Sequence, residues 1–185
     1  METAKDRKKI EDLFSKHGFD DFKWFNPKQQ IVISHWVRMK CIFGCPGYGQ
    51  NATCPPNTPS VSDCEKFFQE YTKGVIFHFE KELENPEDRH AWSREVNLKL
   101  VELERDVFLA GNVKVFLLFM DSCEICKNEK CVKVREECKH PKLARPTPEG
   151  MAIDVYTTVR KLGYPIEVLK DYTDIMNRYA FLLVE

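Results

Sequence analysis

Residues 41–64 read CIFGCPGYGQNATCPPNTPSVSDC, and the rest of the chain is organised around this stretch. Its many glycine, proline and asparagine residues predict a constrained loop rather than a core element. All eight cysteines of the chain fall into two groups of four, Cys41, Cys45, Cys54 and Cys64 in this stretch and Cys123, Cys126, Cys131 and Cys138 downstream. This partition indicates metal binding, because grouped thiolates are ligands of soft metals.

The length and composition predict a single metal-binding domain over residues 1–185. Within it we expect an N-terminal helix and linker at 1–30 and cysteine-rich loops at 41–64 and 123–140. Apolar residues make up 43% of the chain, which excludes the disordered class. A net charge of −1 gives no electrostatic basis for binding nucleic acid or an anionic membrane.

The distribution of apolar residues predicts a cytoplasmic protein. The longest apolar run, at residues 113–120, is too short to span a bilayer, and the N-terminal residues contain no apolar signal core. Cytosolic thiols stay reduced, so grouped cysteines in this compartment are ligands or redox centres. A disulfide-rich secreted protein is therefore the less favoured class.

The chain before the first cysteine group predicts one helix and one strand. Ile10, Leu13 and Phe14 recur at helical spacing before Gly18, which predicts a helix over residues 4–17. Residues 31–40, IVISHWVRMK, are rich in β-branched and aromatic side chains. This composition predicts a strand that leads directly into Cys41.

A short helix is expected directly after the first cysteine-rich loop. Ser60 followed by Asp63 is a capping box, and Cys64 falls on the apolar face of the helix that it starts. A buried free cysteine behaves as a small hydrophobic residue. Cys64 is therefore either a ligand or a core residue, whereas Cys41, Cys45 and Cys54 lie in the loop and are stronger ligand candidates.

The remaining residues alternate between strand and helix patterns. We expect strands at residues 73–80, 113–120, 165–169 and 179–184, and helices at residues 92–110 and from Thr147 to Gly163. The run at 113–120 is apolar apart from Lys114, which predicts a central strand buried on both faces that opens onto Cys123. The fold class is α/β or α+β, a layered domain of four to five strands with helices packed on the sheet, in which both cysteine-rich loops follow strand ends.

The cysteine spacing favours iron-sulfur clusters over zinc. The first group is C-x3-C-x8-C-x9-C and the second is C-x2-C-x4-C-x6-C. Structural zinc sites usually present short paired knuckles, and the long intervals of the first group do not fit that pattern. Proline follows Cys45 and Cys54, as it follows ligands in bacterial ferredoxins. We expect one or two [4Fe-4S] clusters, with zinc as the alternative.

The ligand assignment leaves several arrangements open. Eight thiolates would hold two cubane clusters, whereas a site with three thiolates leaves one iron open as a Lewis acid. His140 either replaces a cysteine or donates to a cluster sulfur. Other nearby residues either tune the site or play ordinary turn and surface roles: Gly44, Gly47, Gly49, Lys40, Tyr48 and Arg145.

Over residues 36–164 the chain resembles the predicted metal-binding family called domain of unknown function 2284. The resemblance rests on WVRMKCIFGCPGYG, TCPPNTPS, ELERDVFLAGNVKVF, CKHPKLARPTPEG and IDVYTTVRKLGY. The family position of Cys64 is often not cysteine, and this chain has RPTPEG where an RPSMEA-like segment is usual. The resemblance implies metal, and specifically iron-sulfur, binding by Cys41, Cys45, Cys54, Cys123, Cys126, Cys131 and Cys138. It implies no reaction.

Three functions are consistent with these features. The first is electron transfer with a redox partner protein in anaerobic metabolism. The second is non-redox catalysis at an open cluster iron, such as desulfuration or dehydration, with Lys40 or Arg145 positioning the substrate. The third is a zinc-stabilised binding module without catalysis.

Overall fold

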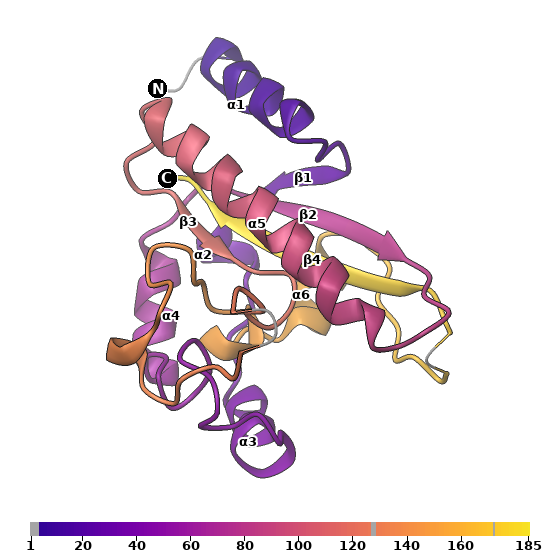
Figure 1. Ribbon diagram of the computed structural model, residues 1–185. Helices are drawn as coiled ribbons and strands as arrows, with labels where there is room; N and C mark the ends of the chain where they lie inside the picture. The colour runs from indigo at the N-terminus through magenta and orange to yellow at the C-terminus, as the bar shows by residue number, and fades with distance from the viewer. Residues whose placement is uncertain (1–3, 127–128, 172) are drawn as a thin grey trace.

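The computed structural model describes residues 4–126, 129–171 and 173–185, and within them the chain forms a four-stranded antiparallel sheet (Figure 1). Residues 127–128 of the second cysteine-rich loop lie outside the described residues. The strand order across the sheet is β1 (Phe22–Phe25), β2 (Gly74–Lys81), β4 (Met176–Leu183) and β3 (Phe116–Leu118). The expected α+β class with four to five strands is therefore confirmed.

Helices cover both faces of the sheet. On one face lie α1 (Ala4–Lys16) and α5 (Asp88–Leu109), and Figure 1 shows α5 running across the strands. On the other face lie α4 (Val61–Gln69) and α6 (Val155–Lys161), and the short α2 (Pro27–Gln30) packs beside α4. None of the helices in the described ranges combines the length and apolar character needed to cross a membrane.

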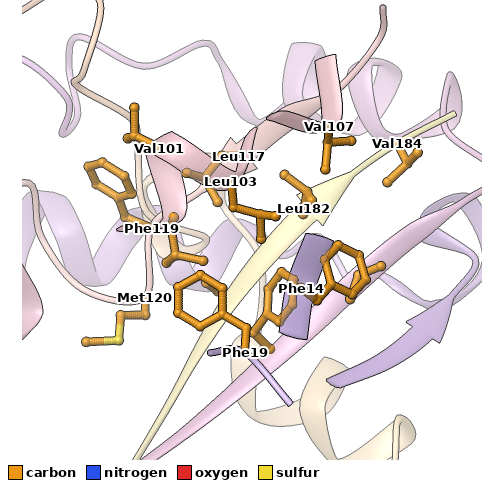
Figure 2. Packing of buried hydrophobic residues seen from close by; sticks show 14 of the residues in the cluster. Phe14, Phe19, Val101, Leu103, Val107, Leu117, Phe119, Met120, Leu182 and Val184 are labelled. Carbon is orange, nitrogen blue, oxygen red and sulfur yellow. The ribbon is translucent and has the colours of Figure 1, made fainter. Parts of the chain in front are cut away.

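Strand alternation divides the apolar side chains between two cores. In β2, Val75 and Phe77 face α1 and α5, whereas Ile76 faces α4 and α6. Figure 2 shows the first core, in which Phe14 of α1 packs among residues of α5, β3 and β4. The rings of Phe14 and Phe77 meet edge to face with their centroids 5.0 Å apart. This packing fixes the sheet against α1 and α5, and with it the ends of the strands from which the loops begin.

The expected helices at 4–17, 92–110 and after Ser60 are confirmed. Ser60 Oγ accepts a hydrogen bond from Asp63 N and so caps α4. Gly18 ends α1 with a φ of 77°, a conformation that side-chain-bearing residues rarely adopt. Local signals are sufficient for these elements because caps and apolar periodicity agree in each of them.

The expected strand at residues 31–40 is wrong, because His35–Gly44 form helix α3. Arg38 fixes this helix against the rest of the fold by donating hydrogen bonds to the carbonyls of Pro59 and Gly150, each at 3.1 Å. Strand propensity reflects packing on a sheet face more than a backbone preference, and within the described residues this segment makes only an isolated bridge, between Ile33 and Ile153. The first cysteine-rich loop therefore follows a helix end and not a strand end.

Four further expectations need correction. Residues 113–120 supply only β3, which is buried on both faces but lies at the sheet edge. The outer edge is covered because Leu117 N donates to the Glu104 carboxylate and Phe119 N donates to the Pro146 carbonyl, both at 2.9 Å.

The helix expected from Thr147 to Gly163 is divided into η2 (Glu149–Met151) and α6 by Ala152, whose φ is 61°. Residues 165–169 form no strand, whereas residues 22–25, expected as a linker, form β1. Pro165 lacks an N–H for a strand ladder, and Arg160 instead binds the carbonyl of Ile166 at 3.1 Å.

Candidate metal centre and adjoining cavity

Helix α3 presents the first two cysteines on one helical turn. Cys41 lies in the last turn, and Cys45 is the residue that caps the C-terminus. Burial, followed by the neighbouring Cys45 thiol, raises the pKa of the Cys41 thiol, and the Arg38 guanidinium opposes that rise. The C-x3-C spacing thus places two thiols on one face of a helix end, since residues four apart are neighbours there.

A tight loop then carries the chain to Cys54. Gly49 has a φ of 67°, and its N–H donates to the Pro55 carbonyl at 3.0 Å. Cys54 N donates to the Asn51 carbonyl at 3.2 Å. Of the three glycines considered in the first cysteine-rich loop, Gly49 adopts the left-handed conformation, whereas Gly44 is helical. The constrained-loop prediction is confirmed for the segment that follows α3.

The second cysteine group follows β3 and lies beside the first. Asn57 Nδ2 donates to the carbonyl of Lys133 at 2.7 Å and to that of Asn51 at 3.0 Å, which joins the two loops directly. In Figure 1 the loop before α4 and the orange loop after β3 run side by side below the sheet. The segments that contain Asn57 and Lys133, which are 76 residues apart in sequence, therefore lie side by side.

Cys54 links the two groups of cysteines. Burial raises the pKa of its thiol to about 12, and the next causes are the thiols of Cys45, Cys41, Cys123 and Cys131. Burial also raises the pKa of Cys123 to about 11, assisted by the thiols of Cys131, Cys126 and Cys138 and opposed by a backbone hydrogen bond. Seven cysteines from both groups therefore belong to one electrostatically connected set.

Cys64 has a different environment. Its side chain is fully buried (0% exposed) in the core beneath α4, and its Sγ lies 3.6 Å from the Pro59 carbonyl oxygen. Burial raises the pKa of the Cys64 thiol, and the charged groups that act on it are Arg38 and Asp63 rather than another thiol. The structure thus places Cys64 on the apolar helix face that its sequence position predicted.

The donor types fit a soft metal, although no complete coordination site is formed. Over residues 4–126, 129–171 and 173–185, no three His, Cys, Asp or Glu side chains are arranged to hold a metal ion. The connected thiols nevertheless supply the ligand chemistry of iron-sulfur and zinc sites. Burial favours the protonated form of these thiols, whereas a metal binds the thiolate form. Metal binding would therefore release protons and would be coupled to the conformation of the loops.

The other residues singled out from sequence take separate places. Arg145 pairs with the buried Glu104, its Nη2 lying 2.7 Å from Oε2. The Lys40 ammonium lies 5.6 Å from the centre of the Trp36 ring. Through its carbonyl, His140 accepts hydrogen bonds from the N–H groups of residues 143 and 144, each at 3.0 Å. Of this set, Tyr48 lines the cavity beside the cysteines.

An open cavity of about 570 Å³ adjoins the first cysteine group. Its wall includes Cys41, Cys45 and Cys54 together with residues from β4, the segment after β3 and the loop before α6. Polar groups on this wall that sequence reasoning missed are Asp121, Glu149 and Arg178. The sequence offered one indication of this wall, which is that Arg178 lies within an otherwise mostly apolar stretch at residues 176–183.

Glu149 lines the same cavity wall as the three cysteines. Desolvation of its carboxyl group raises the pKa of Glu149 and the Asp121 carboxylate adds to that rise, whereas a backbone hydrogen bond and Arg178 oppose it, although the residue as a whole is exposed. The Glu149 charge also acts on the Cys41 thiol. The cavity and the thiol set are therefore one continuous region.

The family model described as predicted metal-binding protein (DUF2284) matches residues 23–184. The chain belongs to the DUF2284 family. The match confirms the resemblance read from the cysteine segments and extends it over β1 and β4. No curated protein and no solved structure matches the chain. Membership in DUF2284 supports metal binding in general and specifies neither the metal nor a reaction.

Proposed function

We propose that this chain is a cytoplasmic iron-sulfur protein that transfers electrons to or from a partner protein in anaerobic metabolism. One or two [4Fe-4S] clusters would supply the one-electron chemistry. The observation that carries this proposal is the position of Cys54, whose thiol is within electrostatic reach of both cysteine groups. A protein that gathers thiols from two distant segments has a donor set suited to clusters.

Particular residues would hold these clusters. From the first group they are Cys41, Cys45 and Cys54, and from the second Cys123, Cys126, Cys131 and Cys138. A single zinc ion takes four ligands, so seven connected thiols exceed what one zinc site would need. The prolines after Cys45 and Cys54 restrict the backbone beside two of these thiols.

Helix α3 supplies a surface suited to a redox partner. Trp36, Met39 and Phe43 lie on its solvent side, with 46%, 45% and 84% of their surfaces exposed. The charged side chains of this helix are Arg38 and Lys40, both cationic. An acidic electron-transfer protein would therefore complement this face, on which Phe43 lies within one turn of Cys41 and Cys45.

Anaerobic purification followed by iron, sulfide and zinc analysis tests the proposal. We expect equal iron and sulfide, a broad visible absorption band, and an EPR signal after reduction. Zinc without sulfide would refute the cluster assignment and favour the zinc-stabilised binding module.

The second candidate function is non-redox catalysis at a cluster with an open iron. It is favoured by one observation, that the first group offers three thiols beside a cavity while Cys64 is buried elsewhere. Neither candidate uses Cys64 as a ligand, so Cys64→Ala should leave the iron content unchanged and the first site with three thiolates. A cluster signal that shifts when a small substrate is added would then favour catalysis over electron transfer.

A further inference from the structure

We propose that the cavity beside Cys41, Cys45 and Cys54 binds a small carboxylic acid with an apolar body, whose carboxylate pairs with Arg178. For its place next to a metal centre this inference rests on the proposed function, whereas the binding itself depends only on the cavity wall. Nothing in the DUF2284 match assigns such a site.

Among the described residues, Arg178 is a partly buried cation that has no close ion-pair partner. It is the third residue of β4, and only 26% of its side chain is exposed. Its contacts are long: 3.9 Å to Asp121, 3.5 Å to the Asn177 carbonyl and 3.7 Å to the Met176 sulfur. A guanidinium group withdrawn from water normally has close charge-assisted hydrogen bonds, typically about 2.7–2.9 Å long.

The nearest carboxylate is already held by other groups. Asp121 accepts hydrogen bonds from Ser93 Oγ at 3.1 Å and from Ser122 N at 2.8 Å. Arg89 Nε lies 3.3 Å from the same carboxylate and offsets its charge. The charge of Arg178 is therefore left for a group that enters the cavity.

The two other carboxyl groups on the wall also have partners. Glu149 is hydrogen-bonded to the Thr147 side chain. Glu167 lies 3.4 Å from Arg160 and is mostly exposed to solvent. Arg178 is thus the cation on the described cavity wall that can donate two parallel hydrogen bonds to an entering carboxylate. Guanidinium groups favour this two-point geometry.

The rest of the wall determines the body of the ligand. The apolar contributors come from three segments: Met120 after β3, Val155 at the start of α6, and Ile166, Val168 and Leu169 after α6. Tyr48, Tyr156 and Tyr179 add aromatic surface. A volume of about 570 Å³ lies within the range of small-molecule sites, which are mostly apolar with a few polar anchors. An aromatic or short aliphatic acid matches this combination.

Calorimetric titration of the anaerobically purified protein tests the inference. The probes are benzoate and hexanoate, and the matched neutral probes are benzamide and hexanamide. We expect saturable binding of both acids and at least about tenfold weaker binding of the amides, because only the acids form an ion pair with Arg178. No saturable binding of either acid, or equal binding of acid and amide, would overturn the site.

Two substitutions place the binding at Arg178. Arg178→Gln should weaken benzoate binding at least about tenfold, whereas Arg105→Gln, which removes the same charge from the exposed face of α5, should leave it unchanged. Equal affinities of the two variants would contradict the assignment. If Arg178→Gln fails to fold, the acid-amide comparison on the unmodified protein still decides.

Iron and sulfide analysis of the same samples separates the two proposals. Benzoate binding to protein without iron and sulfide would leave the carboxylate site standing and refute the cluster. A cluster-containing protein that binds neither acid would refute the carboxylate site alone.

Discussion

At the scale of single residues, the same side chain takes two roles according to its surroundings. Cys54 lies in a constrained loop among other thiols, whereas Cys64 is packed beneath α4 with no exposed surface. The sequence left the role of Cys64 open because a loop cysteine and a cysteine on an apolar helix face are equally compatible with a C-x9-C interval.

Alanine substitutions at these two positions should therefore have opposite effects. Cys54→Ala should lower the metal content of the purified protein and change its folding stability less, since the thiol lies outside the sheet cores. Cys64→Ala should keep the metal content and lower the free energy of unfolding by about 1–2 kcal/mol through a small core cavity. Metal analysis and urea denaturation of both variants test this. Loss of metal from Cys64→Ala would instead make Cys64 a ligand.

Arg145 is expected to act on stability rather than on metal or substrate. Glu104 is buried and accepts hydrogen bonds from Leu117 N and Arg145 Nε, both at 2.9 Å. Arg145→Ala leaves this carboxylate without its cation, which typically costs about 3–5 kcal/mol. Urea denaturation should show that loss, whereas Arg105→Ala on the exposed face should change stability by less than about 0.5 kcal/mol. A small effect of Arg145→Ala would contradict the structural role.

Asp21 is expected to make stability depend on acid pH. Burial would raise the pKa of its carboxyl group, but hydrogen bonds from Tyr164 and His78, each 2.7 Å long, lower the pKa overall. A lowered pKa means that the contribution is complete above the unfolded value of about 3.9 and is lost as pH falls through the folded value.

Asp21→Asn should consequently destabilise the protein at pH 7 and less so at pH 3. Because 57% of the Asp21 side chain is exposed, solvent screening limits the effect at pH 7 to less than about 1 kcal/mol. Paired thermal melts of the two proteins at each pH measure it, and effects of acid common to both cancel. A difference that grows toward pH 3 would have the wrong sign.

At the scale of elements, helix α3 shows where composition misleads. The segment 31–40 has strand-like residues, yet in the structure only Val37 of α3 is buried while Trp36, Met39 and Phe43 point to solvent. Its helical form is stabilised by Arg38, which reaches carbonyls at residues 59 and 150. Contacts at that sequence distance are not visible in a local pattern.

Helix α6 depends on one buried cap. Asp154 accepts hydrogen bonds from Thr157 N at 3.0 Å and Thr157 Oγ1 at 2.7 Å. Asp154→Ala should lower the free energy of unfolding by about 1 kcal/mol. Asp154→Asn should keep most of the stability of the unmodified protein, because asparagine is an equally good cap. Urea denaturation compares the two variants. Equal losses would show that the charge, and not the cap, stabilises this helix.

At the scale of the whole molecule, the sheet and the cysteine-rich loops differ in what stabilises them. The sheet has a packed core on each face. In the described part of the second loop, residues 129, 137 and 138 donate their backbone hydrogen bonds to residues only three positions earlier. Bound metal would therefore add far more order to the loops than to the sheet.

Removal of metal should consequently loosen the loops and leave the sheet protected. After anaerobic treatment with a chelator, we expect amide exchange to rise at least about tenfold in residues 46–58 and 129–140, with little change in β2 and β4. Hydrogen-exchange mass spectrometry measures both regions at once, and reloading with iron and sulfide is the control. An equal rise in β2 and β4 would mean that metal stabilises the whole fold.

The sequence by itself determined the chemistry and the local elements. The grouping of eight cysteines indicated a soft metal, and caps with apolar periodicity placed α1, α4, α5 and β2. These features depend on neighbours within a few residues, so a linear pattern contains them.

Tertiary structure alone decided which residues meet. It made Cys54 the link between the two cysteine groups, placed Cys64 in a core and turned Arg178 into a cavity beside three thiols. Each of these outcomes depends on contacts between residues far apart in the chain. Such contacts are set by the packing of the whole fold, so the local pattern that predicts each element does not contain them.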